Sequence, residues 1–199
     1  YHLYFDGTTG FNNPVTGSAG DGSTYINCGN TLNMNGSFTV GGWVKNDGMD
    51  YTTIMSKRER PNNDYYTGWH LSYENTGLIE FILQDFSNGG PTISVTTPQI
   101  FDELFHLVAV FESESHLSLY VNGILVNRVE TNFTGLSNNN APFLISGLQD
   151  PGWWTWDGIL DELFVYEGVL SDSQIHDISN NHLSLSEIDM SSYWKFNSG

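Results

Sequence analysis

Three of the six tryptophans lie within one short segment, Gln149–Asp157, which reads QDPGWWTWD. Pro and Gly in this segment predict a loop, and aromatic rings exposed on a loop usually have a binding role. Indole faces stack on the apolar faces of sugar rings, while carboxylates and amides bind the hydroxyls. The segment therefore predicts a carbohydrate site built from Trp153, Trp154, Trp156 and Asp157. The alternative is that Trp154 or Trp156 folds inward and packs in the core.

A second predicted loop carries further aromatic residues together with basic ones. It runs from Arg58 to Trp69 and reads RERPNNDYYTGW. Tyr65, Tyr66 and Trp69 are predicted to be additional stacking rings for the sugar. The adjoining cluster Lys57–Arg60 holds three of the six basic residues, which suit either a sulfated or carboxylated polymer or pairing with nearby carboxylates. Pairing is expected, because the chain is strongly acidic.

The charge balance of the chain limits its partners. Six Lys and Arg against 23 Asp and Glu give a formal net charge of −17. This charge repels phosphate backbones and anionic membrane surfaces, so we expect no nucleic-acid partner. No apolar run approaches the roughly 18 residues that cross a membrane, so we expect no membrane insertion. Cys28 is the single cysteine, which excludes an internal disulfide and a zinc-finger framework.

Short apolar runs between Gly, Asn, Asp and Pro residues predict an all-β fold. Ser37–Val44, Gly77–Leu83 and Leu104–Phe111 are examples of such runs. Similar runs give about twelve strands at spacings of about 8–12 residues, which is typical of a two-sheet antiparallel β-sandwich. The pair Asn122-Gly123 between two alternating runs predicts a hairpin with a type I′ turn, because both residues tolerate positive φ.

One short helix is predicted near the C-terminus. Ser171-Asp-Ser-Gln174 matches a capping box, and apolar residues at helical spacing extend the predicted helix over 172–180. No Pro-rich or Ser-rich linker divides the sequence, so we expect a single domain over 1–199. Residues 193–197 are predicted to form an edge strand that closes this domain.

Four blocks of sequence carry a family resemblance: Leu3–Gly7, Ser37–Lys45, Phe105–Gly123 and Gly158–Ser171. In this order and spacing the chain resembles the concanavalin A-like lectin/glucanase superfamily, in particular laminin-G-type domains close to the pentraxins. The resemblance implies a jelly roll, in agreement with the strand count. Tyr193–Gly199 resembles the strand that usually opens such domains. It either pairs beside the N-terminal strand or begins a following module, and we expect the former because an unpaired edge would expose backbone groups.

The likeness to pentraxins implies a calcium ion at the rim of the sandwich. Asn63 and Asp64 resemble part of a calcium-binding loop, and Gln149 and Asp150 resemble a stretch that supplies further ligands. Carboxylate and amide oxygens suit a hard cation. The pentraxin stretch is richer in acids, and the alternative is that these four residues are ordinary solvated turn residues.

Asp6 and Asp161 form a second candidate calcium pair. The resemblance implies it, because related sandwiches often hold a structural calcium between the first strand and this late one. Simple alternation places Asp161 on one face with Leu163 and Val165, so its carboxylate is predicted to point inward and to need a partner. The alternative is that Asp161 lies at a strand end and accepts hydrogen bonds from backbone N–H groups.

The sequence contains no convincing catalytic set. Asp161 and Glu162 are adjacent, so on a strand their side chains would point to opposite faces and could not flank one glycosidic bond. Glu187-Ile-Asp189 begins the glucanase motif Glu-x-Asp-x-x-Glu, but Ser192 replaces its second Glu. We therefore expect no enzyme.

These observations together predict a non-catalytic, lectin-like carbohydrate-binding module that contains calcium. Its partner is expected to be a glycan or polysaccharide, and its location extracellular, either secreted or on a cell or virion surface. The alternative is a structural or adhesion module, such as a capsid decoration, tail or matrix component. In that case the exposed aromatic rings would bury against a protein partner.

Overall fold

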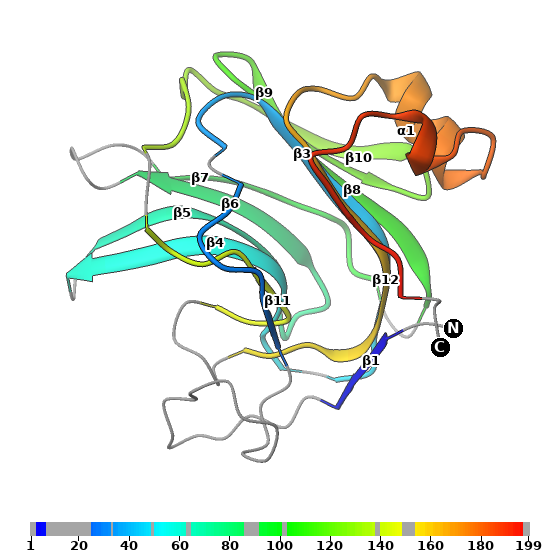
Figure 1. Cartoon of the computed structure of the whole chain (residues 1–199), viewed down its shortest axis with the longest axis horizontal. Coiled ribbons are helices and arrows are strands. Elements are labelled where there is room, and N and C mark those ends of the chain that lie inside the picture. Colours follow the sequence, from blue (N-terminus) through cyan, green and yellow to red (C-terminus); the bar gives the residue numbers. More distant parts are fainter. Residues whose placement is uncertain are drawn as a thin grey trace.

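The computed structural model describes residues 3–6, 25–32, 34–48, 50–62, 65–85, 92–100, 103–137, 140–148 and 154–196. Two antiparallel sheets pack face to face as a sandwich, with one short helix near the C-terminus (Figure 1). The predicted all-β fold class is therefore confirmed. The described residues form thirteen strands, close to the number expected from the apolar runs.

The larger sheet has seven strands, in the order β1-β12-β3-β8-β9-β10, with β13 also paired to β12. Each pairing is antiparallel. One face of the sheet packs against the core, and the other packs against the helix. The strands are β1 (Leu3–Asp6), β3 (Phe38–Asn46), β8 (Phe105–Glu112), β9 (His116–Val121), β10 (Ile124–Glu130), β12 (Asp157–Tyr166) and β13 (Ser192–Trp194).

The smaller sheet has six strands in the order β2-β11-β4-β5-β6-β7. They are β2 (Ile26–Asn27), β4 (Thr52–Asn62), β5 (Tyr65–Tyr73), β6 (Ile79–Asp85), β7 (Thr92–Thr96) and β11 (Leu144–Ile145). Alternation along β5 turns Trp69, Leu71 and Tyr73 toward the core. Phe38 of the other sheet packs against the Trp69 ring with a centroid distance of 5.4 Å, so the core forms where these two faces meet.

Two local sequence signals produce the predicted hairpin and helix. Asn122 and Gly123 have φ values of 50° and 77° and join β9 to β10, as a type I′ turn requires. Helix α1 (Asp172–Ser179) begins with a complete capping box between Ser171 and Gln174. Its apolar residues pack on the outer face of the seven-stranded sheet, where Figure 1 places it. The described residues include no helix long and apolar enough to cross a membrane.

A bulge in β12 divides its outer edge between two short strands. Leu3 of β1 pairs with Leu160, and Trp194 of β13 pairs with Leu163, so the two strands follow one another along the same edge. The register with β3 shifts between Asp161 and Phe164. The closing strand predicted over 193–197 is β13, which covers Ser192–Trp194. It lies on the same side of β12 as the N-terminal strand β1, in line with it, and pairs with β12 rather than with β1.

The neighbouring rings of Trp154 and Trp156 provide a matched stability test. Trp156 is fully buried, whereas Trp154 is 39% exposed. We expect Trp156→Ala to lower the free energy of unfolding by about 3–5 kcal/mol through the cavity it leaves. Trp154→Ala is expected to cost about 1 kcal/mol, the size of one ring–ring contact. Urea unfolding of both variants measures this, and equal losses would contradict the assignment of Trp156 to the core.

Candidate functional site

An exposed pair of aromatic rings lies at the start of β4. Tyr51 is 41% exposed and Trp154 is 39% exposed, and their ring centroids lie 5.7 Å apart with the planes inclined by 31°. The backbone N–H of Thr53 donates to the Trp154 carbonyl at 2.7 Å, which ties the loop to the first residues of β4. Trp154 has a φ of 57°, a left-handed conformation that is uncommon outside Gly and often found at functional sites.

Tyr51 was not among the predicted site residues. It stands alone between polar residues in a turn, and no local pattern distinguishes it from an ordinary turn tyrosine. Only the fold brings Tyr51 beside Trp154, about a hundred residues later in the chain. The two rings lie side by side in space and each is partly exposed, so aromatic surface is available at this position for stacking on a sugar ring.

Two of the rings predicted to stack on sugar belong to the core instead. Trp156 is fully buried, its backbone N–H donates to Ser146 Oγ at 3.0 Å, and its indole N–H donates to the Ile159 carbonyl at 3.2 Å. Trp69 is 1% exposed and packs between the sheets. Neither ring presents a face to solvent, so the prediction for these two residues is wrong. The sequence alternation of Trp69 with Leu71 and Tyr73 was the signal for burial.

Several predicted site residues lie outside the described part of the chain. They are Trp153 of the tryptophan-rich loop and the candidate calcium ligands Asn63, Asp64, Gln149 and Asp150. For Tyr65 and Asp6 the strand position is described and the side chain is not. Their predicted roles therefore stay predictions.

Tyr66 lies on the outer face of the six-stranded sheet, under the guanidinium of Arg58. The Arg58 carbon Cζ is 3.6 Å from the Tyr66 ring centre, and the nitrogen Nη1 is 3.5 Å from His70 Nδ1. Burial, followed by the Arg58 charge, holds the pKa of His70 well below its usual value. One face of the Tyr66 ring is therefore occupied from within the protein, which leaves less of it for a ligand.

The basic cluster is largely internal. Lys57 is 3% exposed and its ammonium donates to Asn30 Oδ1 and to the Ala141 carbonyl, each at 2.8 Å. Arg58 is 8% exposed. Neither the expected pairing of Lys57 with carboxylates nor an exposed anion-binding role fits these contacts. The Lys57 side chain instead fastens the segments that contain Asn30 and Ala141 to β4.

Asp157 is half-buried at the start of β12, close to the aromatic pair in sequence. Its backbone carbonyl accepts a hydrogen bond from the Asp47 N–H at 2.8 Å. A Cβ built on Gly48 would lie 3.1 Å from Asp157 Oδ2, so the carboxylate lies against this glycine. Nearby, Asn46 Oδ1 and Thr155 Oγ1 are buried without a hydrogen-bond partner in the described structure. This end of the sandwich therefore holds polar groups that internal contacts leave unsatisfied.

The predicted calcium pair Asp6 and Asp161 does not fit the strand register. Asp6 is directly opposite Asp157, four positions and therefore about 13 Å along the strand from Asp161. The bulge also breaks the alternation, so Asp161 does not share the inward face of Leu163 and Val165. Asp161 Oδ1 accepts the backbone N–H of Glu162 at 2.8 Å. The structure thus supports the backbone hydrogen bond of the alternative, but Asp161 lies within β12 rather than at a strand end.

Within the described ranges, no three His, Cys, Asp or Glu side chains form a group suited to a metal ion. The candidate calcium ligands at the rim fall outside those ranges.

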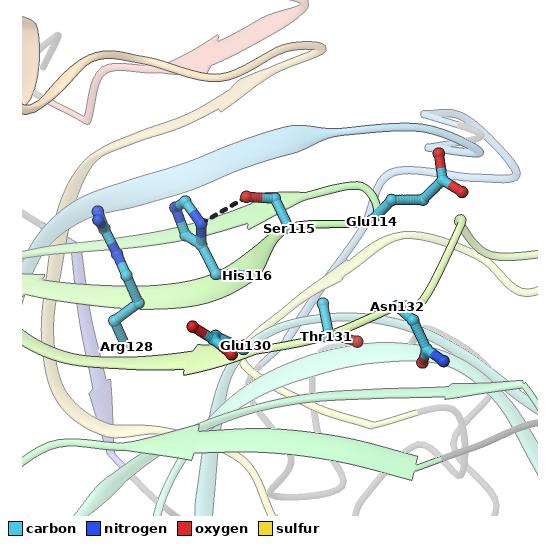
Figure 2. A pocket seen from close by; sticks show the side chains of 7 residues that line it. All are labelled: Glu114, Ser115, His116, Arg128, Glu130, Thr131 and Asn132. Atoms are coloured by element: carbon cyan, nitrogen blue, oxygen red, sulfur yellow. Dashed lines mark hydrogen bonds between the residues drawn. The ribbon is translucent and has the colours of Figure 1, made fainter.

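A polar hollow of about 630 Å³ lies along the β9–β10 hairpin, where Figure 2 shows its seven lining side chains. His116 is engaged on both sides, with Nδ1 2.8 Å from Ser115 Oγ and Nε2 3.2 Å from Glu112. Arg128 donates to Ser118 Oγ at 2.9 Å and to the Tyr120 hydroxyl at 3.0 Å. The hollow has no indole or phenol in its lining, so it lacks a stacking surface for sugar.

Residues 18–176 match the family model described as the concanavalin A-like lectin/glucanases superfamily. This match covers most of the chain and includes both rings of the Tyr51–Trp154 pair. No curated protein matches the chain in sequence.

Solved structures with similar folds include carbohydrate-binding and receptor-binding domains. The CBM40 of a Ruminococcus gnavus IT-sialidase, bound to α2,3 sialyllactose, has a TM-score of 0.64 at 15% identity, covering 74% of this chain and 84% of that one. A proposed carbohydrate-binding protein from Bacteroides ovatus has a TM-score of 0.61 at 18% identity, covering 87% and 48%. The binding domain of botulinum neurotoxin serotype D has a TM-score of 0.61 at 19% identity, covering 83% and 41%. The chain thus spans less than half of the latter two.

The buried imidazoles of His70 and His106 are expected to make the free energy of unfolding depend on pH. Burial lowers the pKa of His106 from 6.5 to about 4, and His70 is shifted in the same direction. In the unfolded chain both regain the ordinary pKa and bind protons first, so stability present above about pH 6.5 is lost as the pH falls. For His106 the full loss is about 3 kcal/mol.

Urea unfolding at about pH 7.5, 6.5 and 5.5 measures this slope, above the range in which most carboxylates titrate. The double variant His70→Gln/His106→Gln should flatten it, while His182→Gln, at an exposed position, should not. An unchanged slope in the double variant would refute the assignment to these two groups.

Proposed function

Because the chain belongs to the concanavalin A-like lectin/glucanases superfamily, we propose that it is a non-catalytic carbohydrate-binding module. The observation that carries the proposal is the exposed Tyr51–Trp154 pair. Two large rings that remain in water at one end of a well-packed sandwich call for a ligand, since exposed aromatic surface costs free energy.

The chemistry around the pair suits sugar. The two rings supply an apolar surface for a pyranose face, and Asp50, which is exposed next to Tyr51, supplies a carboxylate that accepts hydrogen bonds from hydroxyls. Similar folds in the Ruminococcus gnavus CBM40 and the Bacteroides ovatus protein support the proposal, because both are described as carbohydrate-binding.

We propose no catalytic activity, because the two adjacent carboxylates of β12 are engaged in hydrogen bonds within the protein. Asp161 is engaged by the backbone N–H of Glu162, and Glu162 forms a hydrogen bond with Tyr193. Glycoside hydrolysis needs two carboxylates that face one bond about 5–9 Å apart. Asp161 and Glu162 are neighbours in the chain and are each held by other groups.

A calcium ion is the second element of the proposal. We propose that an ion is held at the rim of the sandwich by ligands from Asn63, Asp64, Gln149 and Asp150. The support is their oxygen chemistry and the acidity of the chain.

We further propose that the module works outside the cell, where polysaccharides are available to it. The alternative function, an adhesion module with a protein partner, is favoured by one observation. Ile124 and Leu125 on the edge strand β10 are 65% and 38% exposed, and an apolar edge strand can pair with another chain.

The glycan proposal is tested by affinity electrophoresis through gels that contain β-glucan, xylan, arabinan or galactomannan. We expect one of them to retard the protein, and we expect Trp154→Ala and Tyr51→Ala each to weaken the affinity about tenfold by removing one stacking face. Tyr4→Ala is the matched control, because Tyr4 is 53% exposed on the other sheet. Retardation that survives the Tyr51/Trp154 double variant would place the site elsewhere.

The calcium proposal is tested by thermal melts with EDTA, calcium or magnesium. Saturating calcium is expected to raise the midpoint by about 5–10 °C over EDTA, because an ion that binds only the folded state stabilises it by mass action. Asp64→Asn and Asp150→Asn should each reduce the shift, because both carboxylates are proposed ligands of the ion. Identical melts in calcium and EDTA would remove calcium from the proposal.

A further inference from the structure

A cavity on the outer face of the seven-stranded sheet is separate from the Tyr51–Trp154 pair. Its volume is about 210 Å³, and it lies between the sheet and the chain that follows helix α1. Figure 1 shows this C-terminal chain beside β3 and β12. The aromatic and charged lining consists of Trp43, His106, Glu162, Tyr193 and Lys195, to which Asn181 adds an amide.

The floor of the cavity is formed by Trp43 and His106, whose side chains lie on adjacent strands. Trp43 of β3 pairs with His106 of β8 on one side and with Asp161 of β12 on the other. The Trp43 and His106 rings lie 5.2 Å apart between centroids, and His106 stacks on Phe164 at 6.3 Å. Trp43 is only half-buried, because α1 covers the sheet further along. Part of its indole is therefore available as a flat apolar surface.

His106 is the buried titratable group that lines the cavity. It is 1% exposed, and its Nδ1 is buried without a hydrogen-bond partner among the residues that the structure describes. Burial lowers its pKa to about 4, so the imidazole is neutral at physiological pH. A neutral imidazole carries one donor and one acceptor. This nitrogen is inaccessible to solvent, so a molecule in the cavity does not reach it, and His106 contributes to the site through its ring contact with Trp43.

The walls of the cavity are held in uncommon backbone conformations. Glu162 and Asn181 have φ values of 48° and 57°. Bulges and left-handed residues are frequent where a protein aims a side chain at a ligand. Glu162 also forms a hydrogen bond with the hydroxyl of Tyr193, whose pKa burial and this carboxylate raise to about 12. The carboxylate thus has a fixed position at the wall and keeps further lone pairs for a second donor.

The lining discriminates between classes of ligand. The Glu162 carboxylate opposes an anion, and the Lys195 ammonium opposes a cation. Ile178, Leu183 and Leu185 also line the cavity, but an apolar molecule would leave the Glu162 carboxylate and the Asn181 amide without partners. A neutral ring with one apolar face and several hydroxyls satisfies all of these groups, and the cavity volume suits a single ring.

We propose that this cavity binds one neutral pyranose residue, with Trp43 stacked on the ring and Glu162, Asn181 and Lys195 bonded to its hydroxyls. It is a second carbohydrate site, on the sheet opposite to the one that begins beside Tyr51, and it does not depend on the proposed function of the Tyr51–Trp154 pair.

The test is an NMR titration of the intact chain, labelled with nitrogen-15, with the methyl pyranosides of glucose, galactose, mannose and N-acetylglucosamine. We expect at least one of them to give saturable shifts of the Trp43 indole N–H and of the Asn181 and Lys195 amides. Glu162→Gln keeps the size and the φ of the residue and should weaken binding about tenfold, as expected for loss of a hydrogen bond to a charged group.

The controls separate this site from the first one. Trp43→Ala should abolish the shifts, and Trp43→Phe should restore part of them if the alanine variant loses structure. The Tyr51→Ala/Trp154→Ala double variant should leave them unchanged. Absence of saturable shifts at the cavity for all four glycosides overturns the proposal, as do shifts that persist in a folded Trp43→Ala variant. Shifts confined to Tyr51 and Trp154 overturn it too, and would leave the proposed function standing.

Discussion

The bulge of β12 at Asp161 and Glu162 is the constraint on which the outer half of the molecule depends. A strand without it would keep strict alternation across these two residues. With the extra residue, Leu160, Leu163 and Val165 all face the core, while Phe164 turns outward to meet the helix. The docking of α1, the two-part edge of β12 and the wall of the second cavity all follow from this one irregularity.

The sequence predicted best what is decided within a few residues. The Asn122-Gly123 turn and the Ser171 capping box are local, because their own backbone preferences and hydrogen bonds determine them. Burial of a loop tryptophan is not local: Trp154 and Trp156 are two positions apart, and only the packing of β12 makes one of them a core residue. The inward prediction for Asp161 failed for a related reason, since periodicity cannot register a single inserted residue.

The candidate site shows the same difference between residues that local sequence predicts and residues that only tertiary packing brings together. Trp154 was predicted as a site residue because its loop is rich in tryptophan. Tyr51 could not be predicted, because only the fold places it beside Trp154. Burial of the basic residues also had no sequence signal. With Lys57 and Arg58 inside, two of the six basic residues are withdrawn from the surface, so the exterior is more acidic than a uniform distribution of charge would make it. Such a surface disfavours the approach of polyanionic glycans relative to neutral ones.

The two strands that share the outer edge of β12 lie head to tail. Ser192 is opposite Val165 and Trp194 opposite Leu163, and the line continues with Leu3 opposite Leu160 and Asp6 opposite Asp157. A chain that began at Ser192 and ran on into Leu3 would lay its backbone along this edge in the same direction. The strands would therefore occupy the same positions if β13 preceded β1 in the chain, as in a circular permutation. What the sandwich requires is that the edge be filled, and either order of synthesis fills it.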